Sequence, residues 1–303
     1  MRLLAGTASW TDPTLLACGR FYPREAHDAQ SRLRFYATRF GLAEVDSSYY
    51  ALPSAENAYL WAQRTPDDFV FNIKAYRLFT GHQTPLAALP ADIRRELADW
   101  PEPVIYHHAM PDDLRDELWR RYTLALEPLR MAGKLGAVHF QFPPWLRRGA
   151  RGEALVAECA RRLPEHLLSV EFRHRSWFDS SEATAATLAL ERELGLVHTV
   201  VDAPQGFDNS VPAVWECTHP ELTLLRLHGR NVATWNAGGA ASSGRFQYEY
   251  SEAELAELAR RFQELAQRSA QAHAVFNTNF EDQGMRNAAA FAAALGGGQD
   301  RLG

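Results

Sequence analysis

The sequence of 303 residues contains little cysteine, no long apolar run and no excess of positive charge. Its three cysteines, Cys18, Cys159 and Cys217, are too few and too widely spaced for a disulfide framework or a cysteine-ligated zinc site. Such sparse cysteine fits a reducing cytosol, so we expect a cytoplasmic protein. No segment approaches the ~20 apolar residues of a membrane span, and the first apolar run is shorter than that of a signal peptide. We therefore expect no membrane partner.

The charge balance disfavours a further class of protein. The chain carries 32 Lys and Arg against 37 Asp and Glu, which gives a formal net charge of −5. A protein whose whole surface binds nucleic acid is usually strongly basic. The average charge still allows a local cationic pocket, and it favours no particular oligomeric state.

The composition, 46% hydrophobic and 23% charged, is that of a globular protein, and the length suits two domains or one α/β barrel. Eight apolar runs of strand length, rich in Val, Leu or Phe, recur along the chain. They are Leu3–Ser9, Leu42–Ser47, Phe69–Lys74, Gly136–Phe142, Leu167–Arg173, Leu196–Asp202, Leu222–His228 and His273–Asn279.

Helical patterns lie between these runs. The pattern that starts at Ser251 has Glu254 three residues later, the spacing of a capping box in which each side chain bonds the other residue's backbone N–H. The expected helices are Gln30–Phe40, Ser54–Arg64, Pro111–Ala132, Gly152–Leu163, Ser181–Leu194, Ser251–Ala270 and Gly284–Leu295.

Strands that alternate with helices form either a doubly wound open sheet or a (β/α)8 barrel. The count of eight favours the barrel, because eight strands are what a TIM barrel requires. We predict one TIM-barrel domain over residues 1–303, with eight parallel strands. Long loops are expected over residues 75–110 and 229–247, after the third and seventh strands, and a flexible tail over 296–303.

A shared polar pattern also favours the barrel. In each strand, alternate residues become polar toward the carboxyl end, and the period of two places them on one face. Barrel active sites lie at this end of the strands. The residues are Thr7 and Ser9, Glu44 and Asp46, Asn72 and Lys74, His139 and Gln141, Glu171 and Arg173, His198 and Asp202, Arg226 and His228, and Asn277 and Asn279.

The fifth strand ends in the densest group of reactive side chains. Arg173 and Arg175 could bind a phosphate or carboxylate through bidentate hydrogen bonds. Glu171 is a candidate general base or metal ligand. The structural alternative is a Glu171–Arg173 ion pair that closes the barrel.

The seventh strand ends in a second group of candidates. Arg226 and Arg230 add positive charge, and Gly229 permits a ligand to approach the backbone closely. His228 could act as an acid, a base or a ligand, or it could be a structural histidine.

Carboxylates end further strands. Asp46 and Asp202, together with Glu171 and His228, are the candidate catalytic residues, and such a set leaves a divalent metal open. The spacing matches no compact metal-ligand motif and no nucleotide-cofactor motif, so the metal and its ligands stay unassigned. The residues expected to bind a substrate or anion are Lys74, Arg173, Arg175, Arg226, Arg230, Trp10, Tyr49, Trp177, Gln141 and Asn277.

Several of these segments together resemble the DUF72 family, which includes the YecE-like proteins. The motifs include Gly6–Trp10, Val45–Ser54, Gln141–Pro144, Val170–Phe178 and Arg226–Asn231, and they run nearly from end to end. The resemblance implies a TIM-barrel fold and does not imply a reaction. Asp46 departs from the asparagine usual in the family, so a charge is added at the expected site.

The sequence favours an enzyme that acts on a small anionic, phosphorylated substrate or on nucleic acid. Phosphodiester hydrolysis of endonuclease-like character is a fold-level analogy. A carbohydrate-active barrel and a non-catalytic binder of nucleic acid or another ligand are the alternatives. In the favoured case, we expect an anion between Arg173 and Arg226.

Overall fold

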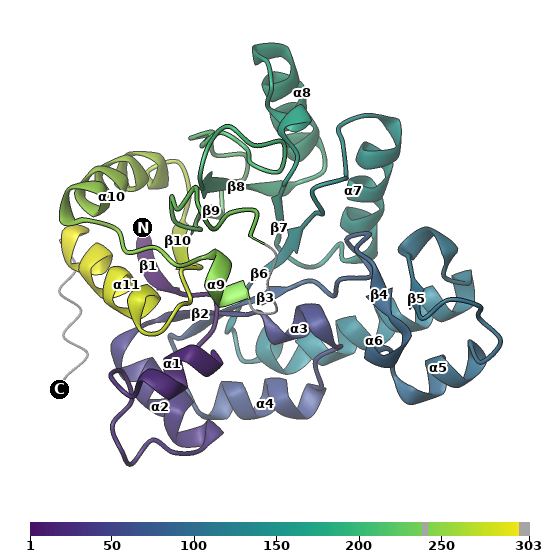
Figure 1. Ribbon diagram of the computed structural model, residues 1–303, viewed down its shortest axis with the longest axis horizontal. Coiled ribbons are helices and arrows are strands. Elements are labelled where there is room, and N and C mark those ends of the chain that lie inside the picture. Colours follow the sequence, from purple (N-terminus) through teal and green to yellow (C-terminus); the bar gives the residue numbers. More distant parts are fainter. Residues whose placement is uncertain (238–241, 297–303) are drawn as a thin grey trace.

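The computed structural model describes residues 1–237 and 242–296, and eight parallel strands in it close into a barrel (Figure 1). Around the barrel the strands are ordered β1-β10-β9-β8-β7-β6-β3-β2. The prediction of eight parallel strands in a closed barrel is therefore confirmed. The strands are β1 (Arg2–Thr7), β2 (Leu42–Val45), β3 (Val70–Lys74), β6 (Leu135–Gln141), β7 (Leu168–Glu171), β8 (Leu196–Asp202), β9 (Leu222–Leu227) and β10 (Gln271–Phe276).

Each of the seven predicted helices is present, with ends that differ by a few residues. Side-chain caps fix several starts, and the predicted capping box between Ser251 and Glu254 is confirmed. The long helices are α2 (Ala29–Arg39), α4 (Ala55–Gln63), α6 (Asp112–Met131), α7 (Ala150–Arg162), α8 (Ser181–Glu193), α10 (Glu252–Ala266) and α11 (Gln283–Ala294). Short helices are α1 (Pro13–Cys18) and α3 (Ser47–Tyr50). No helix in the described ranges is long and apolar enough to cross a membrane.

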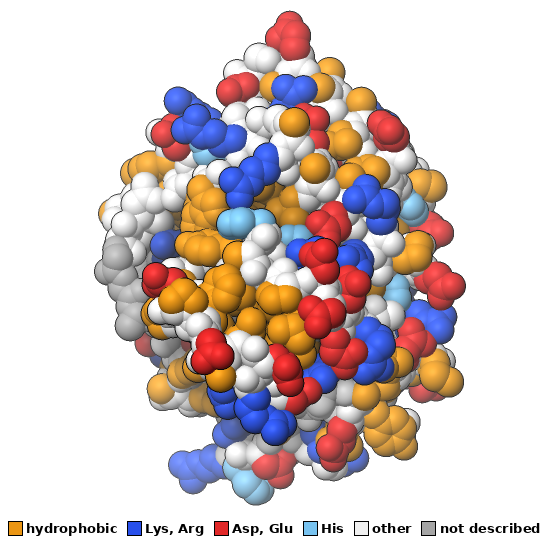
Figure 2. Space-filling model, turned by 90° about the vertical axis from the view of Figure 1, so that its right-hand side faces the viewer, with side chains coloured by type: hydrophobic (Ala, Val, Ile, Leu, Met, Phe, Trp, Pro, Cys, Tyr) orange, Lys and Arg blue, Asp and Glu red, His pale blue; other side chains and the backbone are white. Residues whose placement is uncertain are grey.

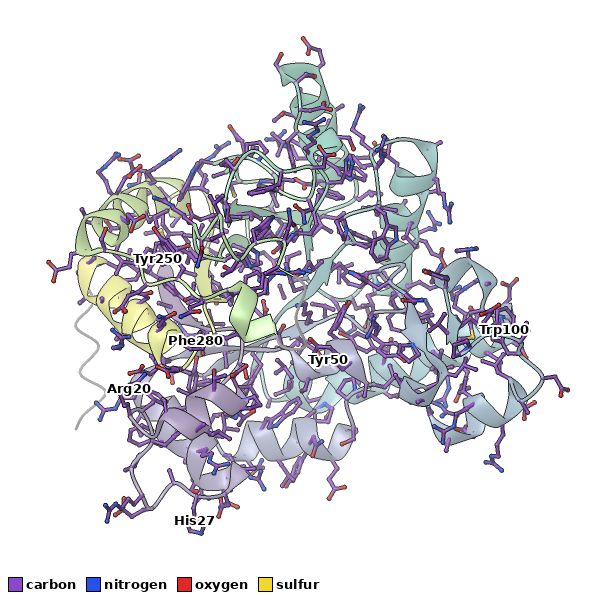
Figure 3. All side chains as sticks on the ribbon, viewed as in Figure 1. Arg20, His27, Tyr50, Trp100, Tyr250 and Phe280 are labelled. Atoms are coloured by element: carbon purple, nitrogen blue, oxygen red, sulfur yellow. The ribbon has the colours of Figure 1, made fainter. Side chains whose placement is uncertain are left out.

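The segment 75–110 is not the irregular loop that was predicted. It contains the antiparallel pair β4 (Thr84–Pro85) and β5 (Val104–Ile105), with α5 (Ala91–Glu96) between them. Leu89, Ile93 and Ile105 are buried in the main core, so this segment has an apolar side of its own. It extends to the right in Figure 1, and Trp100 lies on it in Figure 3.

The second predicted loop, 229–247, includes α9 (Ser242–Arg245) near its end. Residues 238–241 of this loop lie outside the described residues, as do 297–303 of the predicted tail.

The interior of the barrel changes from apolar to polar along most of the strands. At the amino end, a buried cluster includes Leu42, Val70, Leu222 and Leu224. Two residues further along β9, alternation places Arg226 on the same face as Leu222 and Leu224. On β2, β3, β6, β7 and β10 the pattern is the same, and the polar side chains meet above an apolar floor. The predicted pattern is wrong for β1 and β8, where Thr7 bonds Tyr36 of α2 and His198 bonds Glu191 of α8, outside the barrel.

Candidate functional site

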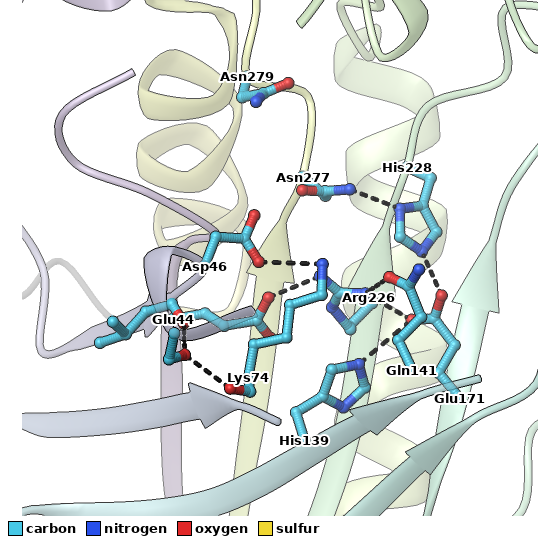
Figure 4. A network of polar contacts seen from close by, with 12 residues as sticks. Glu44, Asp46, Lys74, His139, Gln141, Glu171, Arg226, His228, Asn277 and Asn279 are labelled. Carbon is cyan, nitrogen blue, oxygen red and sulfur yellow. Dashed lines mark hydrogen bonds and ion pairs between the residues drawn. The ribbon is translucent and has the colours of Figure 1, made fainter. Parts of the chain in front are cut away.

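Arg226 lies between two carboxylates at the centre of the polar cluster (Figure 4). Its Nη2 donates to Glu44 Oε1 at 2.6 Å and its Nη1 to Glu171 Oε2 at 2.6 Å. All three side chains are completely buried. Burial alone lowers the pKa of Arg226, but the two carboxylates raise it above its usual value, so the guanidinium is charged. Its charge is thus balanced inside the protein.

Glu171 connects this ion triad to the upper part of the cluster. Its Oε1 accepts hydrogen bonds from Arg173 Nη1 at 2.8 Å and from His228 Nε2 at 3.1 Å. Burial alone raises the pKa of Glu171, but Arg226, His228 and the nearby His139, whose Nε2 lies 3.5 Å from Oε2, lower it well below its usual range. Glu171 is therefore an anion that fixes its neighbours.

His228 is held in one orientation from both sides of its ring. Its Nε2 faces Glu171, while its Nδ1 lies 2.9 Å from Asn277 Nδ2. Burial lowers the pKa of His228 to about 3 despite the opposing effect of Glu171, so the ring is neutral. These partners imply a proton on Nε2 and an acceptor at Nδ1. Both nitrogens of this candidate acid or base are therefore occupied.

Asp46 and Lys74 form the part of the cluster that solvent reaches. Asp46 Oδ1 lies 3.1 Å from Lys74 Nζ, and the two side chains are 24% and 12% exposed. Ser48 Oγ donates to the carbonyl oxygen of Lys74 at 2.6 Å and thereby joins the start of α3 to the end of β3. This pair ends two neighbouring strands and faces the mouth of the barrel.

Two cations lie over the ring of Tyr49, which packs against His82 of the segment after β3 at a centroid distance of 5.2 Å. Lys74 Nζ is 5.1 Å and the Arg77 guanidinium 5.2 Å from the ring centre of Tyr49. Burial lowers the pKa of His82 to about 3, and the charges of Lys74, Arg77 and Arg173 lower it further. The guanidinium of Arg173 also lies 4.9 Å from the ring centre of Trp235. Positive charge therefore converges at this side of the mouth.

Asp202 belongs to a clamp at the base of the 229–247 segment. It pairs with Arg230 at 2.8 Å and accepts a hydrogen bond from Tyr250 Oη at 2.6 Å. Tyr250 Oη in turn accepts from the backbone N–H of Gly229 at 2.9 Å. Gly229 has φ +81°, and a Cβ there would lie 2.4 Å from Cβ of Tyr248. Asp202 thus bonds Arg230 at the start of the segment and Tyr250 just after its end, and it holds the two ends close together.

Replacing Tyr250 by phenylalanine tests this clamp. The change removes one hydrogen bond from Asp202, which keeps Arg230, and leaves the buried Gly229 N–H without its acceptor, so we expect a loss of about 1–3 kcal/mol in the free energy of unfolding. Hydrogen exchange should accelerate at Gly229–Trp235. Tyr59→Phe on α4, where the ring is exposed, is the control. Unchanged stability and exchange in Tyr250→Phe would show that the clamp does not hold the segment.

Besides Arg230 of the clamp, three predicted binding residues lie outside the cluster. Trp177 is completely buried and stacks on Phe172 at a centroid distance of 3.8 Å. Trp10 packs in the main core beside Trp61. Arg175 points to the surface, where it pairs with Asp208 at 3.0 Å.

Most of the other predicted residues do come together. Four members of the cluster were not assigned to the site from the sequence. Glu44 and His139 followed the strand pattern and could have been found by it. Arg77 and His82 lie in a segment without periodicity, so no such signal marked them. The predicted residues that meet at the mouth are Asp46, Tyr49, Lys74, Gln141, Glu171, Arg173, Arg226, His228 and Asn277.

The possibility of a metal gains no support from the side chains. Across residues 1–237 and 242–296, no group of three or more His, Cys, Asp or Glu is arranged to hold a metal ion. Instead, the guanidinium of Arg226 lies between the carboxylates of Glu44 and Glu171.

The fold and this cluster define a class of protein, a single (β/α)8 barrel with a polar site at the carboxyl ends of its strands. The chain belongs to the DUF72 family, because the family model described as "Protein of unknown function DUF72" matches residues 4–302. This confirms the resemblance that the motifs indicated.

Known relatives agree with this assignment. The UPF0759 protein YunF of Bacillus subtilis (strain 168) is 31% identical over 277 residues, which cover 90% of this chain and 88% of the relative. The structure of a DUF72 family protein from Enterococcus faecalis V583 has a TM-score of 0.78 at 23% identity, covering 97% of this chain and 95% of its own. Another, from Thermotoga maritima MSB8, has a TM-score of 0.74 at 25% identity and covers 98% and 100%.

Proposed function

We propose that this protein is an enzyme that binds a phosphorylated substrate at the carboxyl end of the barrel and hydrolyses a phosphate ester. The observation that carries the proposal is the position of Lys74 and Arg77, whose charged groups lie 5.1 and 5.2 Å from the ring centre of Tyr49 at the mouth of the barrel. The chain has a net charge of −5, and Figure 2 shows one face on which Lys and Arg are interspersed with Asp and Glu. A cationic mouth on such a body attracts an anionic ligand to one place.

Arg173 is the side chain best prepared to bind the phosphate. Its Nη1 bonds Glu171, and its face packs on Trp235, so the guanidinium is held in one orientation. A guanidinium has five N–H donors in a fixed plane, and among the described residues the bonds of Arg173 involve Nη1. The remaining donors suit two oxygens of a phosphate.

Asp46 is the carboxylate that a substrate can reach, because Glu44 and Glu171 are completely buried. In the proposed reaction, a water oxygen attacks phosphorus and its proton passes to the carboxylate of Asp46. The phosphorus–oxygen ester bond breaks, and the leaving oxygen takes a proton from the ammonium of Lys74, which solvent replaces. Glu171 and His228 position Arg173 and Asn277 without touching the reacting atoms.

Binding and turnover of simple phosphates test the proposal. We expect the protein to bind inorganic phosphate and to hydrolyse bis(p-nitrophenyl) phosphate. Arg173→Ala removes charged hydrogen bonds, which should weaken phosphate binding by about 10- to 100-fold in calorimetry. Asp46→Asn removes the general base, so we expect kcat to fall by about 10²- to 10⁴-fold with little change in binding.

Arg175→Ala provides the matched control, because Arg175 is an arginine two positions away that faces Asp208 at the surface. It should leave both measurements unchanged. Phosphate binding without turnover would favour the non-catalytic alternative, and absence of phosphate binding would refute the proposal. The carbohydrate-active alternative has less support, because Glu44 and Glu171 are both engaged with Arg226.

A further inference from the structure

Four aromatic rings form a continuous row at the mouth of the barrel. The ring of Trp145 meets His82 edge to face at a centroid distance of 5.6 Å, and His82 meets Tyr49 at 5.2 Å. Tyr49 then contacts Tyr50, labelled in Figure 3, at 4.9 Å. The rings come from the segments after β2, β3 and β6, so the fold brings together side chains that are distant in the sequence.

The two ends of this row are open to solvent, whereas its middle is covered. Trp145 is 57% exposed and Tyr50 is 55% exposed, while His82 is buried. A single exposed ring is common on a protein surface. Here, however, the exposed rings continue a packed row that leads to the charged cluster, and their free faces offer flat apolar surface to a ligand.

Positive charge lies beside one ring in the middle of the row. Lys74 Nζ lies 5.1 Å from the ring centre of Tyr49, and the guanidinium of Arg77 lies 5.2 Å from it. A ligand that covers the row therefore needs an aromatic part for the rings and an anionic part for the cations. Nucleotides have this combination, and proteins that bind single strands combine aromatic rings with positive charge in the same way.

We propose that the substrate is a nucleotide or a nucleotide unit of a single strand, with its base stacked on Trp145 and its phosphate held by Lys74, Arg77 and Arg173. This inference rests on the proposed function and names its substrate class. A sugar phosphate fits less well, because the neighbour packed against Trp145 is the ring of His82, whose Nδ1 already bonds Thr80 Oγ1 at 2.8 Å. Recognition at this position thus relies on ring faces rather than on hydroxyl groups.

The test compares four probes by calorimetry: inorganic phosphate, ribose 5-phosphate, thymidine monophosphate and a ten-nucleotide oligothymidylate. Loss of one stacked base weakens binding by about 5- to 100-fold. We therefore expect Trp145→Ala to weaken both thymine-containing probes by that factor. Inorganic phosphate and ribose 5-phosphate should bind as before. Trp145→Phe keeps a ring and should restore most of the affinity.

Tyr59→Ala serves as the matched control, because Tyr59 is as exposed as Tyr50 but lies on the outer helix α4. It should change none of the four affinities. Tighter binding of the oligothymidylate, with a further loss in Tyr50→Ala, supports a strand; equal binding of both thymine probes supports a free nucleotide.

Two failures can be told apart. If the thymine probes bind no better than ribose 5-phosphate, or if Trp145→Ala affects all probes equally, the nucleotide assignment is wrong while the phosphate site stands. If Arg173→Ala leaves phosphate binding unchanged, the proposed function itself is wrong.

Discussion

Replacing Arg226 by methionine is expected to lower the free energy of unfolding by about 3–5 kcal/mol. The change removes the cation that balances the completely buried Glu44, and it leaves Glu171 paired with Arg173. An isolated buried carboxylate is far less stable than a paired one, because the interior solvates charge poorly. Urea unfolding near neutral pH measures the loss.

A charge-balanced variant shows whether the unpaired carboxylate causes this loss. In the double variant Glu44→Gln and Arg226→Met, one buried charge of each sign is removed and Glu171 still pairs with Arg173, so most of the stability should return. Arg120→Met is the control, since Arg120 pairs with Glu117 at the surface at 2.6 Å. Ion pairs at the surface contribute about 0–1 kcal/mol to the free energy of unfolding. A loss of that small size in Arg226→Met would contradict the account of the triad.

Acid should destabilise the protein steeply, beginning near the ordinary pKa of histidine. Burial lowers the pKa values of His82, His228 and His273 from 6.5 to about 3. Between these values the unfolded chain binds protons that the folded chain does not, so stability falls as pH falls. Each histidine lowers the free energy of unfolding by up to about 1.4 kcal/mol for each pH unit of acidification. The three together lower it by up to about 4 kcal/mol per pH unit.

Unfolding free energies measured between about pH 6 and pH 4.5 give this slope. Over most of that range the carboxyl of Glu171, whose pKa is also lowered, stays ionised in both states; its contribution is lost at lower pH. His273→Gln should reduce the slope by one histidine, whereas His27→Gln, at an exposed position, should leave it unchanged. Direct NMR titration provides a second readout. Imidazole signals of His228 or His273 that titrate near pH 6.5 would contradict the prediction.

Much of the fold could be predicted because the strands and helices depend on the local periodicity of apolar residues. Short runs of four to seven mainly apolar residues indicated all eight strands. Apolar residues spaced three and four positions apart indicated the long helices. Local capping was also predictable, since Ser251 and Glu254 lie three positions apart and need no distant partner. The segment 75–110 was missed because its helix and strands are short, and its apolar residues are buried only against the rest of the barrel.

The candidate site could be predicted only as a set of side chains at one end of the barrel. The alternation of side chains along a strand placed Glu171, Arg226 and His228 on the inward face. This inference requires only the sequence of the strand itself. It could not show that Trp177 is buried against Phe172, or that Asp202 holds the 229–247 segment instead of the central cluster.

The sequence by itself determined the eight-stranded barrel, its polar end and the shortage of net positive charge. Only the tertiary structure decided which charges balance one another. Glu44 and Arg226 are 182 positions apart, and their contact exists because barrel closure brings β2 and β9 around one interior. The same closure leaves Lys74 and Arg77 beside an aromatic row whose two ends are exposed. Electrostatic energy depends on distance and burial, and neither follows from residue order alone.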